Sequence, residues 1–344
     1  MLNPILTEEE CTLLRSLFDD ADTIVCVCHT NPDGDALGSL LGMGELLRNM
    51  GKEPLLVVPD QWPDYLQWLP NSEKLVRYDK RRDYVDTVLK IADLVICLDF
   101  NVLSRTDAME EALKASPAKK VLIDHHLGPE VDTVLTVSRP EMSSTCEVVF
   151  RIVWQMGLYD KLGKHFAGPI YCGMMTDTGG FTFNSTDPDI FFIISQLLTK
   201  RINKDKMYRL VYHNFSEHRL RMVGYVLYER MVVDEKRHAA YYTLTRKDMK
   251  KFHFVKGDAE GLVNMPLQIK GLKLSISLRE DSERDNTIWV SLRSVDDFPC
   301  NEMAARFFNG GGHLNASGGR VYGTMDDAVR TVEEALKAFE DKLK

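Results

Sequence analysis

The chain has 344 residues, of which 44% are hydrophobic and 27% are charged, and its formal net charge is −8. This length exceeds what one hydrophobic core usually organises, so we expect two domains in a globular protein. The acidic balance argues against a protein that coats long nucleic acid with a broad basic face, although bound cations could still attract a small anionic substrate.

The first ten residues, MLNPILTEEE, contain no basic segment and no long apolar core, which argues against a signal peptide. No apolar run approaches the length of a membrane span. The seven cysteines show no disulfide-like framework, which is typical of reduced thiols. We therefore expect a cytoplasmic protein with no membrane partner.

Strand-like and helical patterns alternate through the first half of the chain. Helices are predicted at 7–20, 36–50, about 82–91, 106–115 and 144–156, and strands at 23–28, 54–58, 93–99 and 119–124. This alternation predicts βαβ units and a parallel sheet. The strands are nearly continuous apolar runs, as expected when helices cover both faces of a sheet.

The pattern changes after residue 187. A helix is predicted at 189–200, a polar linker begins at 201, two strands within 272–294 form a hairpin, and helices follow at 299–308 and 325–343. We therefore predict an α/β protein with an N-terminal parallel-sheet domain at 1–200, a linker at 201–215, and a smaller C-terminal α/β domain at 216–344.

The stretch CHTNPDGDALGS, residues 28–39, is the first candidate site. It places His29, Asp33 and Asp35 on a loop between a strand and a helix, because Pro32 and Gly34 prevent regular structure there. Ligands bind at the carboxyl ends of strands in open α/β sheets. Helix capping would explain one of the aspartates. It does not explain all three side chains, which favours a metal or phosphate site.

Similar groups follow other apolar runs. They are Asp99, Asp124, His125, His126 and Asp177. If each lies at the end of a parallel strand, all share one edge of the sheet. Converging carboxylates repel one another, and bound dications would remove this repulsion. Five aspartates and three histidines suit two metals with a shared aspartate, and oxygen and nitrogen donors are compatible with manganese. Any of these residues alone is more often a cap or core residue, and spacing alone does not assign ligands.

These motifs resemble those of the DHH phosphoesterase superfamily, in its branch with a DHH-associated C-terminal domain. The resemblance rests on HTNPDGDALGS, the strand before Asp99, DHH at 124–126, DTGGF at 177–181 and GGGHLNASGG at 310–319, and spans nearly the whole chain. The nearest likeness is to stand-alone nanoRNases and pAp phosphatases of the NrnA type. Related enzymes hydrolyse cyclic di-AMP or pApA. The resemblance also implies a cleft between the domains and a homodimer.

The resemblance implies specific metal ligands. One Mn(II) would bind His29, Asp33 and Asp99, and a second would bind Asp35, Asp99, His125 and Asp177, so that Asp99 bridges the two ions. Mg or Co are alternatives. His126 would face the scissile phosphate, Asp124 would orient the histidines, and a hydroxide between the metals would attack phosphorus in line. Gly34 would let its neighbouring aspartates turn toward different metals, while Pro32 stiffens the loop.

The glycine-rich segment near the C-terminus is the second part of the predicted site. Gly310, Gly311 and Gly312 would let backbone N–H groups approach a phosphate, and His313 would add a donor. Arg293 could pair with a phosphate through two hydrogen bonds, and Ser317 completes the substrate-binding set that the resemblance implies. Taken singly, the glycines would indicate a flexible turn and the arginine a solvated strand residue.

We therefore expect a manganese-dependent hydrolase of short oligonucleotides (nanoRNA), pAp or pApA. Three alternatives remain: a pyrophosphatase or exopolyphosphatase-related hydrolase, a RecJ-like single-strand exonuclease, and a nucleotide-binding regulator without turnover. The glycine-rich segment disfavours the first. The acidic charge and the lack of room for an OB-fold disfavour the single-strand exonuclease, and the complete ligand set disfavours the regulator without turnover. The sequence does not distinguish nanoRNA, pAp, pApA and cyclic di-AMP.

Overall fold

The computed structural model describes residues 2–255 and 257–344, and the chain divides into two compact units, residues 1–214 and 215–344. The range 201–215, expected as a linker, contains helix α8 (Lys204–Tyr212), which lies within the first unit. None of the helices in the described ranges combines the length and the apolarity that crossing a membrane requires.

A six-stranded, fully parallel sheet forms the centre of the first unit, in the order β3-β2-β1-β4-β5-β6. Its strands are β1 (Ile24–Val27), β2 (Leu55–Val58), β3 (Val76–Arg77), β4 (Leu94–Leu98), β5 (Lys119–Asp124) and β6 (Leu135–Ser138). The four predicted strands are confirmed, and β3 and β6, which were not predicted, form the edges. The strand order reverses between β1 and β4. Such a switch point leaves a crevice at the carboxyl ends of the strands, where open α/β sheets bind ligands.

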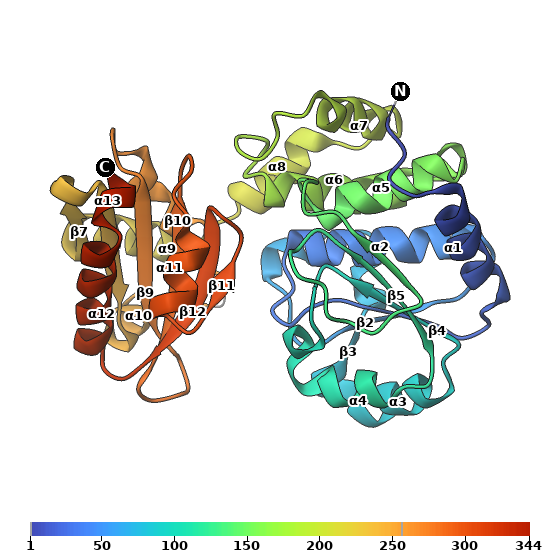
Figure 1. Cartoon of the computed structure of the whole chain (residues 1–344), viewed down its shortest axis with the longest axis horizontal. Helices are drawn as coiled ribbons and strands as arrows, with labels where there is room; N and C mark the ends of the chain where they lie inside the picture. Colours follow the sequence, from blue (N-terminus) through green and yellow to red (C-terminus); the bar gives the residue numbers. More distant parts are fainter. Residues whose placement is uncertain (1, 256) are drawn as a thin grey trace. The chain divides into compact units, whose positions relative to one another are not determined.

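Helices cover both faces of this sheet (Figure 1). One face carries α1 (Glu8–Asp20), α2 (Gly34–Asn49), α5 (Thr145–Gln155), α6 (Lys164–Asp177) and α7 (Pro188–Thr199), and the other carries α3 (Tyr78–Ile91) and α4 (Glu110–Ala115). The apolar β1 and β4 side chains alternate between the two cores, which explains why these strands read as continuous apolar runs.

Helices α2 and α6 pack unusually closely because glycines line their contact. A Cβ atom on Gly34 would lie 2.2 Å from Thr176 Oγ1, and one on Gly38 would lie 2.5 Å from the Pro169 carbonyl oxygen. Side chains at these positions would therefore force the helices apart. This contact brings the C-terminal end of α6 to the N-terminal end of α2, next to the end of β1.

The second unit contains a six-stranded sheet in the order β11-β12-β10-β9-β8-β7. Its strands are β7 (Met231–Asp234), β8 (Ala239–Leu244), β9 (Leu274–Glu280), β10 (Thr287–Ser294), β11 (Gly311–Gly312) and β12 (Ala316–Tyr322), and only β8 and β9 pair in parallel. The predicted hairpin is confirmed as β9 and β10.

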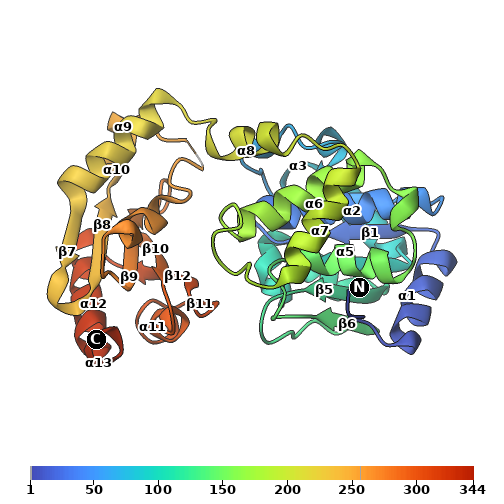
Figure 2. The same cartoon turned by 90° about the horizontal axis from the view of Figure 1, so that it is seen from above.

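Helices flank the second sheet on both sides (Figure 2). They are α9 (Glu217–Tyr225), α10 (Arg246–Lys251), α11 (Cys300–Phe307), α12 (Met325–Ala338) and α13 (Glu340–Leu343). The core between the sheet and α11 and α12 contains Ile288, Val290 and Leu292 of β10, whereas α9 and α10 pack over β8. Both units therefore mix helices and strands, which confirms the predicted α/β class.

Candidate metal centre

His29 lies two residues beyond the end of β1 and is buried. Its Nδ1 atom lies 2.8 Å from the Thr30 carbonyl oxygen, which can only accept a hydrogen bond, so Nδ1 carries the proton. The Nε2 atom faces two carboxylates, 3.4 Å from Asp99 Oδ2 and 3.9 Å from Asp33 Oδ1. With Nδ1 engaged in this way, loss of the proton from Nε2 would present the lone pair of that nitrogen to a cation.

Asp33 and Asp35 play different structural roles at the start of α2. Asp33 is the N-cap, and its Oδ1 atom accepts the N–H groups of Asp35 and Ala36 at 3.0 Å each. Asp35 is fully buried, and its carboxylate accepts the N–H groups of Thr145 and Cys146 at 2.6 and 2.8 Å. These donors belong to the first turn of α5, whose dipole stabilises a negative charge. Capping therefore accounts for Asp33 but not for Asp35.

Asp99 follows β4 and has the conformation of a strained residue. Its φ angle is 65°, in the left-handed region that residues other than glycine seldom occupy. Its Oδ1 atom accepts a 2.9 Å hydrogen bond from Thr145 Oγ1 and lies 3.7 Å from His125 Nε2. Its Oδ2 atom lies 3.4 Å from His29 Nε2. The two oxygens of this single carboxylate therefore face different histidines.

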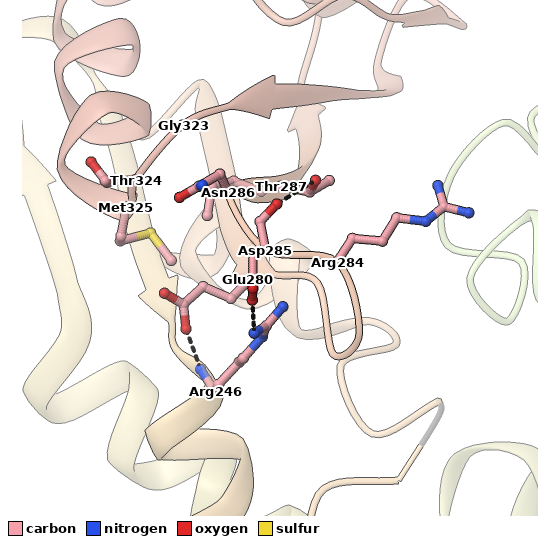
Figure 3. Close-up of a pocket in the computed structure, with 10 residues that line it drawn as sticks. Arg246, Glu280, Arg284, Asp285, Asn286, Thr287, Gly323, Thr324 and Met325 are labelled. Carbon is pink, nitrogen blue, oxygen red and sulfur yellow. Dashed lines mark hydrogen bonds and ion pairs between the residues drawn. The ribbon is translucent and has the colours of Figure 1, made fainter.

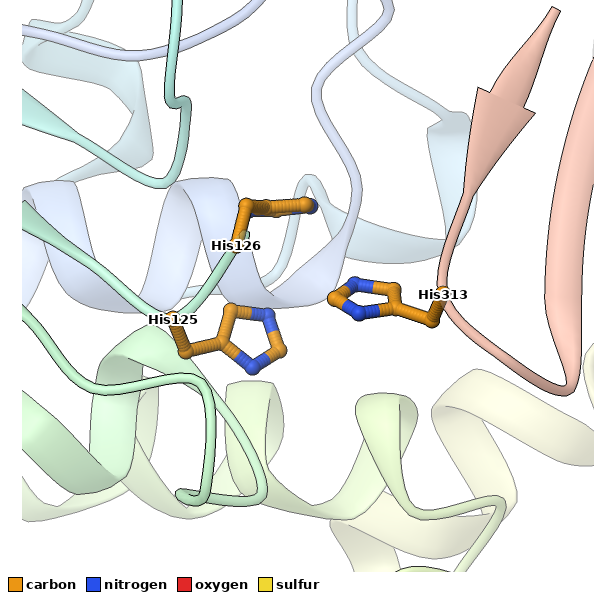
Figure 4. Close-up of side chains that lie close together, drawn as sticks. All are labelled: His125, His126 and His313. Carbon is orange, nitrogen blue, oxygen red and sulfur yellow. The ribbon is translucent and has the colours of Figure 1, made fainter. Parts of the chain in front are cut away.

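The end of β5 carries the DHH motif. His125 and His126 lie side by side with their rings edge to face, 4.8 Å between centroids (Figure 4). His126 Nδ1 lies 2.7 Å from Asp124 Oδ1, and the other oxygen of this buried carboxylate accepts no hydrogen bond from the described residues. His125 Nδ1 donates to the Met142 carbonyl oxygen at 3.3 Å, which leaves its Nε2 atom 3.3 Å from Asp177 Oδ2.

The predicted position of Asp177 is wrong in one respect. It is the last residue of α6 rather than the first residue after a strand, and it reaches the site through the close packing of α6 on α2. Gly34 lies between Asp33 and Asp35, whose carboxylates face different histidines. Its φ angle is not positive, and it is the first residue of α2. The absence of a side chain is needed there because Thr176 occupies the space.

The eight candidates predicted in the first unit thus come together. Their donor atoms form three groups, each with all members within 4.8 Å of one another: His29, Asp33 and Asp99; Asp35, His125 and Asp177; and Asp99, Asp124 and His126. The first two groups correspond to the two ligand sets that the resemblance implies, and Asp99 lies beside both. Nitrogen and oxygen donors without thiolate suit Mn(II) and similar dications.

The clustered carboxylates of the centre also favour the binding of positive ions. Burial raises the pKa of Asp35 well above its usual range, and the nearby charges of Asp99 and Asp177 raise it further. Burial would raise the pKa of Asp99 too, but the hydrogen bond and charge of His29 lower it overall. Since these carboxylates lie together in a buried place, dications would relieve their repulsion. The residues present therefore fit a centre that holds metal ions.

Sequence reasoning missed the contribution of α5. Thr145 donates its N–H to Asp35 and its hydroxyl to Asp99, so that one residue holds carboxylates of both donor groups. The sequence offered one indication of this role, because Thr145 directly follows Ser144, where a helix was predicted to begin. The Ser144 hydroxyl accepts the Glu147 N–H, but the Glu147 carboxylate bonds Ser143 instead of completing a capping box.

The predicted substrate-binding residues lie in the second unit, around the β11–β12 hairpin. A Cβ atom on Gly310 would lie 1.9 Å from the Gly318 carbonyl oxygen, and one on Gly312 would lie 2.6 Å from that of Ala316. These two glycines are therefore required for close strand packing, whereas the Cβ position of Gly311 points into open space.

The remaining predicted substrate-binding side chains lie near this hairpin. His313 follows β11 (Figure 4), and its carbonyl oxygen accepts the Ser317 hydroxyl at 2.8 Å. Arg293 pairs with Ala316 across β10 and β12, and its Nη1 atom donates to the Leu292 carbonyl oxygen at 2.9 Å. The structure thus collects these residues at one end of β10 and β12.

A separate hollow of the second unit lies away from this hairpin (Figure 3). It is lined by Arg246, Glu280, Arg284, Asp285, Asn286, Thr287, Ile288, Gly323, Thr324 and Met325. Arg246 bonds to Glu280 through its backbone N–H and to Asp285 through its guanidinium group. Asp285 thus pairs with the Arg246 cation, and none of the predicted site residues lines the hollow, so we do not assign it to the site.

Comparisons with known proteins agree with this arrangement. Residues 23–174 match the DHH family, N-terminal domain, and residues 239–344 match the DHHA1 domain. The bifunctional oligoribonuclease and PAP phosphatase NrnA of Thermus thermophilus is 27% identical over 323 residues, which cover 91% of this chain and 89% of the relative.

Two solved structures share the fold. An exopolyphosphatase-related protein from Bacteroides fragilis is 48% identical, with a TM-score of 0.95 and 99% of both chains covered. RecJ of Thermus thermophilus, solved in complex with Mn2+, has a TM-score of 0.57 at 12% identity and covers 97% of this chain and 54% of its own. The chain therefore belongs to the DHH family of phosphoesterases, hydrolases of phosphate esters, and carries a DHHA1 domain.

Proposed function

We propose that the chain is a Mn(II)-dependent phosphoesterase that hydrolyses short oligoribonucleotides and pAp with two ions per chain. The observation that carries this proposal is the position of Asp99, whose two carboxylate oxygens face His29 and His125 in separate donor groups. A carboxylate shared in this way is what two-metal hydrolases use to hold their ions close together. Bound dications would activate a water molecule and neutralise charge on the phosphate.

The side chains around the ions have distinct proposed roles. His29 and His125 present Nε2 to the ions because their Nδ1 atoms are engaged with backbone carbonyl oxygens. Asp124 holds His126 through Nδ1, which fixes the ring so that Nε2 can contact the scissile phosphate. In the second unit, Arg293, Gly311 and His313 would bind the phosphate that does not react.

The relatives support two substrate classes. The Thermus thermophilus relative is an oligoribonuclease and PAP phosphatase, which favours nucleotide substrates. The Bacteroides fragilis relative, at 48% identity, is described as exopolyphosphatase-related, which makes inorganic polyphosphate the second candidate. The separate DHHA1 match accounts for most of the second unit in either case.

A substrate panel decides between them. Purified protein with Mn(II) would receive pAp, RNAs of two to five nucleotides, pApA, cyclic di-AMP, pyrophosphate and tripolyphosphate in parallel. We expect kcat/KM to be highest for pAp or short RNA. A clear preference for tripolyphosphate would overturn the nucleotide assignment, and hydrolysis that survives exhaustive chelation would overturn metal dependence.

Metal binding and assembly have readouts of their own. Elemental analysis should find two Mn per chain, and saturating Mn(II) should raise the melting temperature of chelated protein, since a ligand at a hundred times its Kd stabilises by about 2.7 kcal/mol. Mg(II) and Co(II) would be compared. Light scattering tests the proposed homodimer, and fractionation of cells tests the proposed cytoplasmic location.

A further inference from the structure

The loop that follows the DHH motif is held by few contacts. Residues 125–134 connect β5 to β6 and contain neither helix nor strand. The Leu127 side chain is 58% exposed, and Gly128 has no side chain and a φ angle of 68°. Packing against the core resumes only at Val131, which is buried. Among the described residues, Asn101 is the only hydrogen-bond partner of residues 127–130.

Asn101 contacts this loop through three hydrogen bonds. Its Nδ2 atom donates to the carbonyl oxygen of Leu127 at 2.8 Å and to that of Gly128 at 3.4 Å. Its own carbonyl oxygen accepts the Glu130 N–H at 2.8 Å. Because carbonyl oxygens only accept hydrogen bonds, the side chain must present its amide nitrogen to them. A residue without a side-chain donor could not form these two bonds.

The backbone on which Asn101 lies is itself fixed. Phe100 is fully buried in the core that contains side chains of α3 and α4. The Asp99 N–H donates to the Ile123 carbonyl oxygen of β5 at 3.2 Å. Asp99, whose carboxylate the two proposed ions share, is only two residues before Asn101. The loop after β4 is therefore joined to the β5 chain both before and after the DHH motif.

His126 lies between these two connections. Its Nδ1 atom is 3.7 Å from Asp99 Oδ1. Its carbonyl oxygen accepts the Ser138 hydroxyl at 3.3 Å, and the carbonyl oxygen of the next residue, Leu127, accepts the Asn101 amide. The main chain that leaves His126 is thus held from β6 on one side and from the loop after β4 on the other. A shift of this main chain would move the imidazole relative to Asp99.

We propose that Asn101 is a positioning residue for His126, which holds the loop after the DHH motif so that the imidazole keeps its place beside Asp99. The inference deepens the proposed function and rests on it for the contact between His126 and the scissile phosphate. Misplacing a reacting group by about 1 Å can lower a rate about a hundredfold. A contact outside the donor groups can therefore control turnover.

Hydrogen exchange of the full chain tests the contact without any reaction. In Asn101→Ala, the amide hydrogen of Glu130 should exchange about tenfold faster, because the loss of one ordinary hydrogen bond loosens the loop by about this factor. The Arg139 amide, which bonds to the last carbonyl oxygen of β5, should keep its rate and so report an intact fold. Asn49→Ala is the matched control, since Asn49 is another asparagine that donates to a loop carbonyl oxygen, at 3.3 Å. An unchanged Glu130 rate in Asn101→Ala would overturn the proposal.

Kinetics with Mn(II) and a two-nucleotide RNA test the consequence for catalysis. Asn101→Ala should lower kcat about tenfold to a hundredfold, with KM within about twofold and two Mn per chain, while Asn49→Ala should keep the wild-type kcat. In a His126→Ala background, Asn101→Ala should change kcat less than twofold, because the group that it positions is gone. Losses that multiply in the double variant, or a loss of metal in Asn101→Ala, would overturn the proposal.

The two proposals fail in distinguishable ways. If the wild type hydrolyses short RNA and Asn101→Ala loosens the loop without lowering kcat, the positioning role is refuted and the proposed function stands. If the wild type hydrolyses tripolyphosphate but neither short RNA nor pAp, the nucleotide assignment is refuted. The same variants measured with tripolyphosphate then decide the positioning role, which requires that the loss in Asn101→Ala disappear in the His126→Ala background. Hydrolysis of no substrate with any metal would refute both.

Discussion

Gly173→Ala is expected to damage both the core and the candidate metal centre of the first unit. A Cβ atom at this position of α6 would lie 2.2 Å from Cys146 Sγ, 2.9 Å from Asp35 Oδ1 and 3.0 Å from Asp35 Cα. Cys146 and Asp35 are both fully buried, so neither can move without displacing its neighbours. The added methyl group therefore pushes α2, α5 and α6 apart at the point where Asp35 is held.

The size of the effect follows from two opposing contributions. Replacing glycine by alanine inside a helix normally gains about 0.5–1 kcal/mol, whereas overpacking a dense core costs about 1–3 kcal/mol. We expect a net loss of about 1–2 kcal/mol, or about 2–8 °C in the melting temperature of a domain of this size. Since Asp35 is also displaced, kcat/KM should fall about tenfold to a hundredfold.

Calorimetry of the full chain and steady-state kinetics with Mn(II) measure these effects. Gly224→Ala is the matched control, because this position in α9 has open space around its Cβ and should gain about 0.5–1 kcal/mol. Cys146→Ala in the Gly173→Ala background should recover part of the loss by removing the nearest atom. If Gly173→Ala and Gly224→Ala change stability in the same direction, the packing explanation is refuted.

Three further outcomes are expected. Asp99→Asn should abolish hydrolysis and lower the metal content below two ions while circular dichroism stays native; normal turnover would contradict a shared ligand. Thr145→Val should reduce kcat/KM about tenfold to a hundredfold, and Thr145→Ser should restore it. Burial would raise the pKa of Asp248, but its hydrogen bonds with Arg230 and Thr245 lower this pKa overall. The charged carboxylate therefore stabilises the fold above pH about 4, and this contribution to stability is lost at lower pH. When the free energy of unfolding is measured with urea at a series of pH values, Asp248→Asn should therefore reduce the loss of stability at acidic pH. An unchanged loss would refute this reasoning.

The central strands could be predicted because their environment leaves a simple pattern. Strands β1 and β4 are buried on both faces and therefore read as apolar runs. The edge strands leave no such pattern. Strand β3 has only two residues, Val76 and Arg77, and β6 alternates buried and more exposed positions over four residues. Edge strands of this length contribute too few residues for a period to be recognised.

The candidate site could be predicted where it depends on topology alone. His29, Asp99 and Asp124 follow or end parallel strands, and parallel strands bring their carboxyl ends to one edge. Asp177 depends on a helix instead. The apolar residues before it fit a strand as well as a buried helix, because a short apolar run does not distinguish the two. Its convergence with the other groups required knowledge of how α6 packs.

Contacts made by the residues next to the candidate metal ligands explain why α2, α5 and α6 pack so closely. Thr145 holds Asp35 through its backbone and Asp99 through its hydroxyl, so a shift of the first turn of α5 would move carboxylates of both donor groups together. Gly34 and Gly173 allow α6 to approach α2 and α5 at the same level of the structure. The spacing between the two donor groups is therefore set by contacts among three helices as well as by the strand ends. This dependence accounts for glycines that have ordinary helical backbone angles and still cannot be replaced by larger residues.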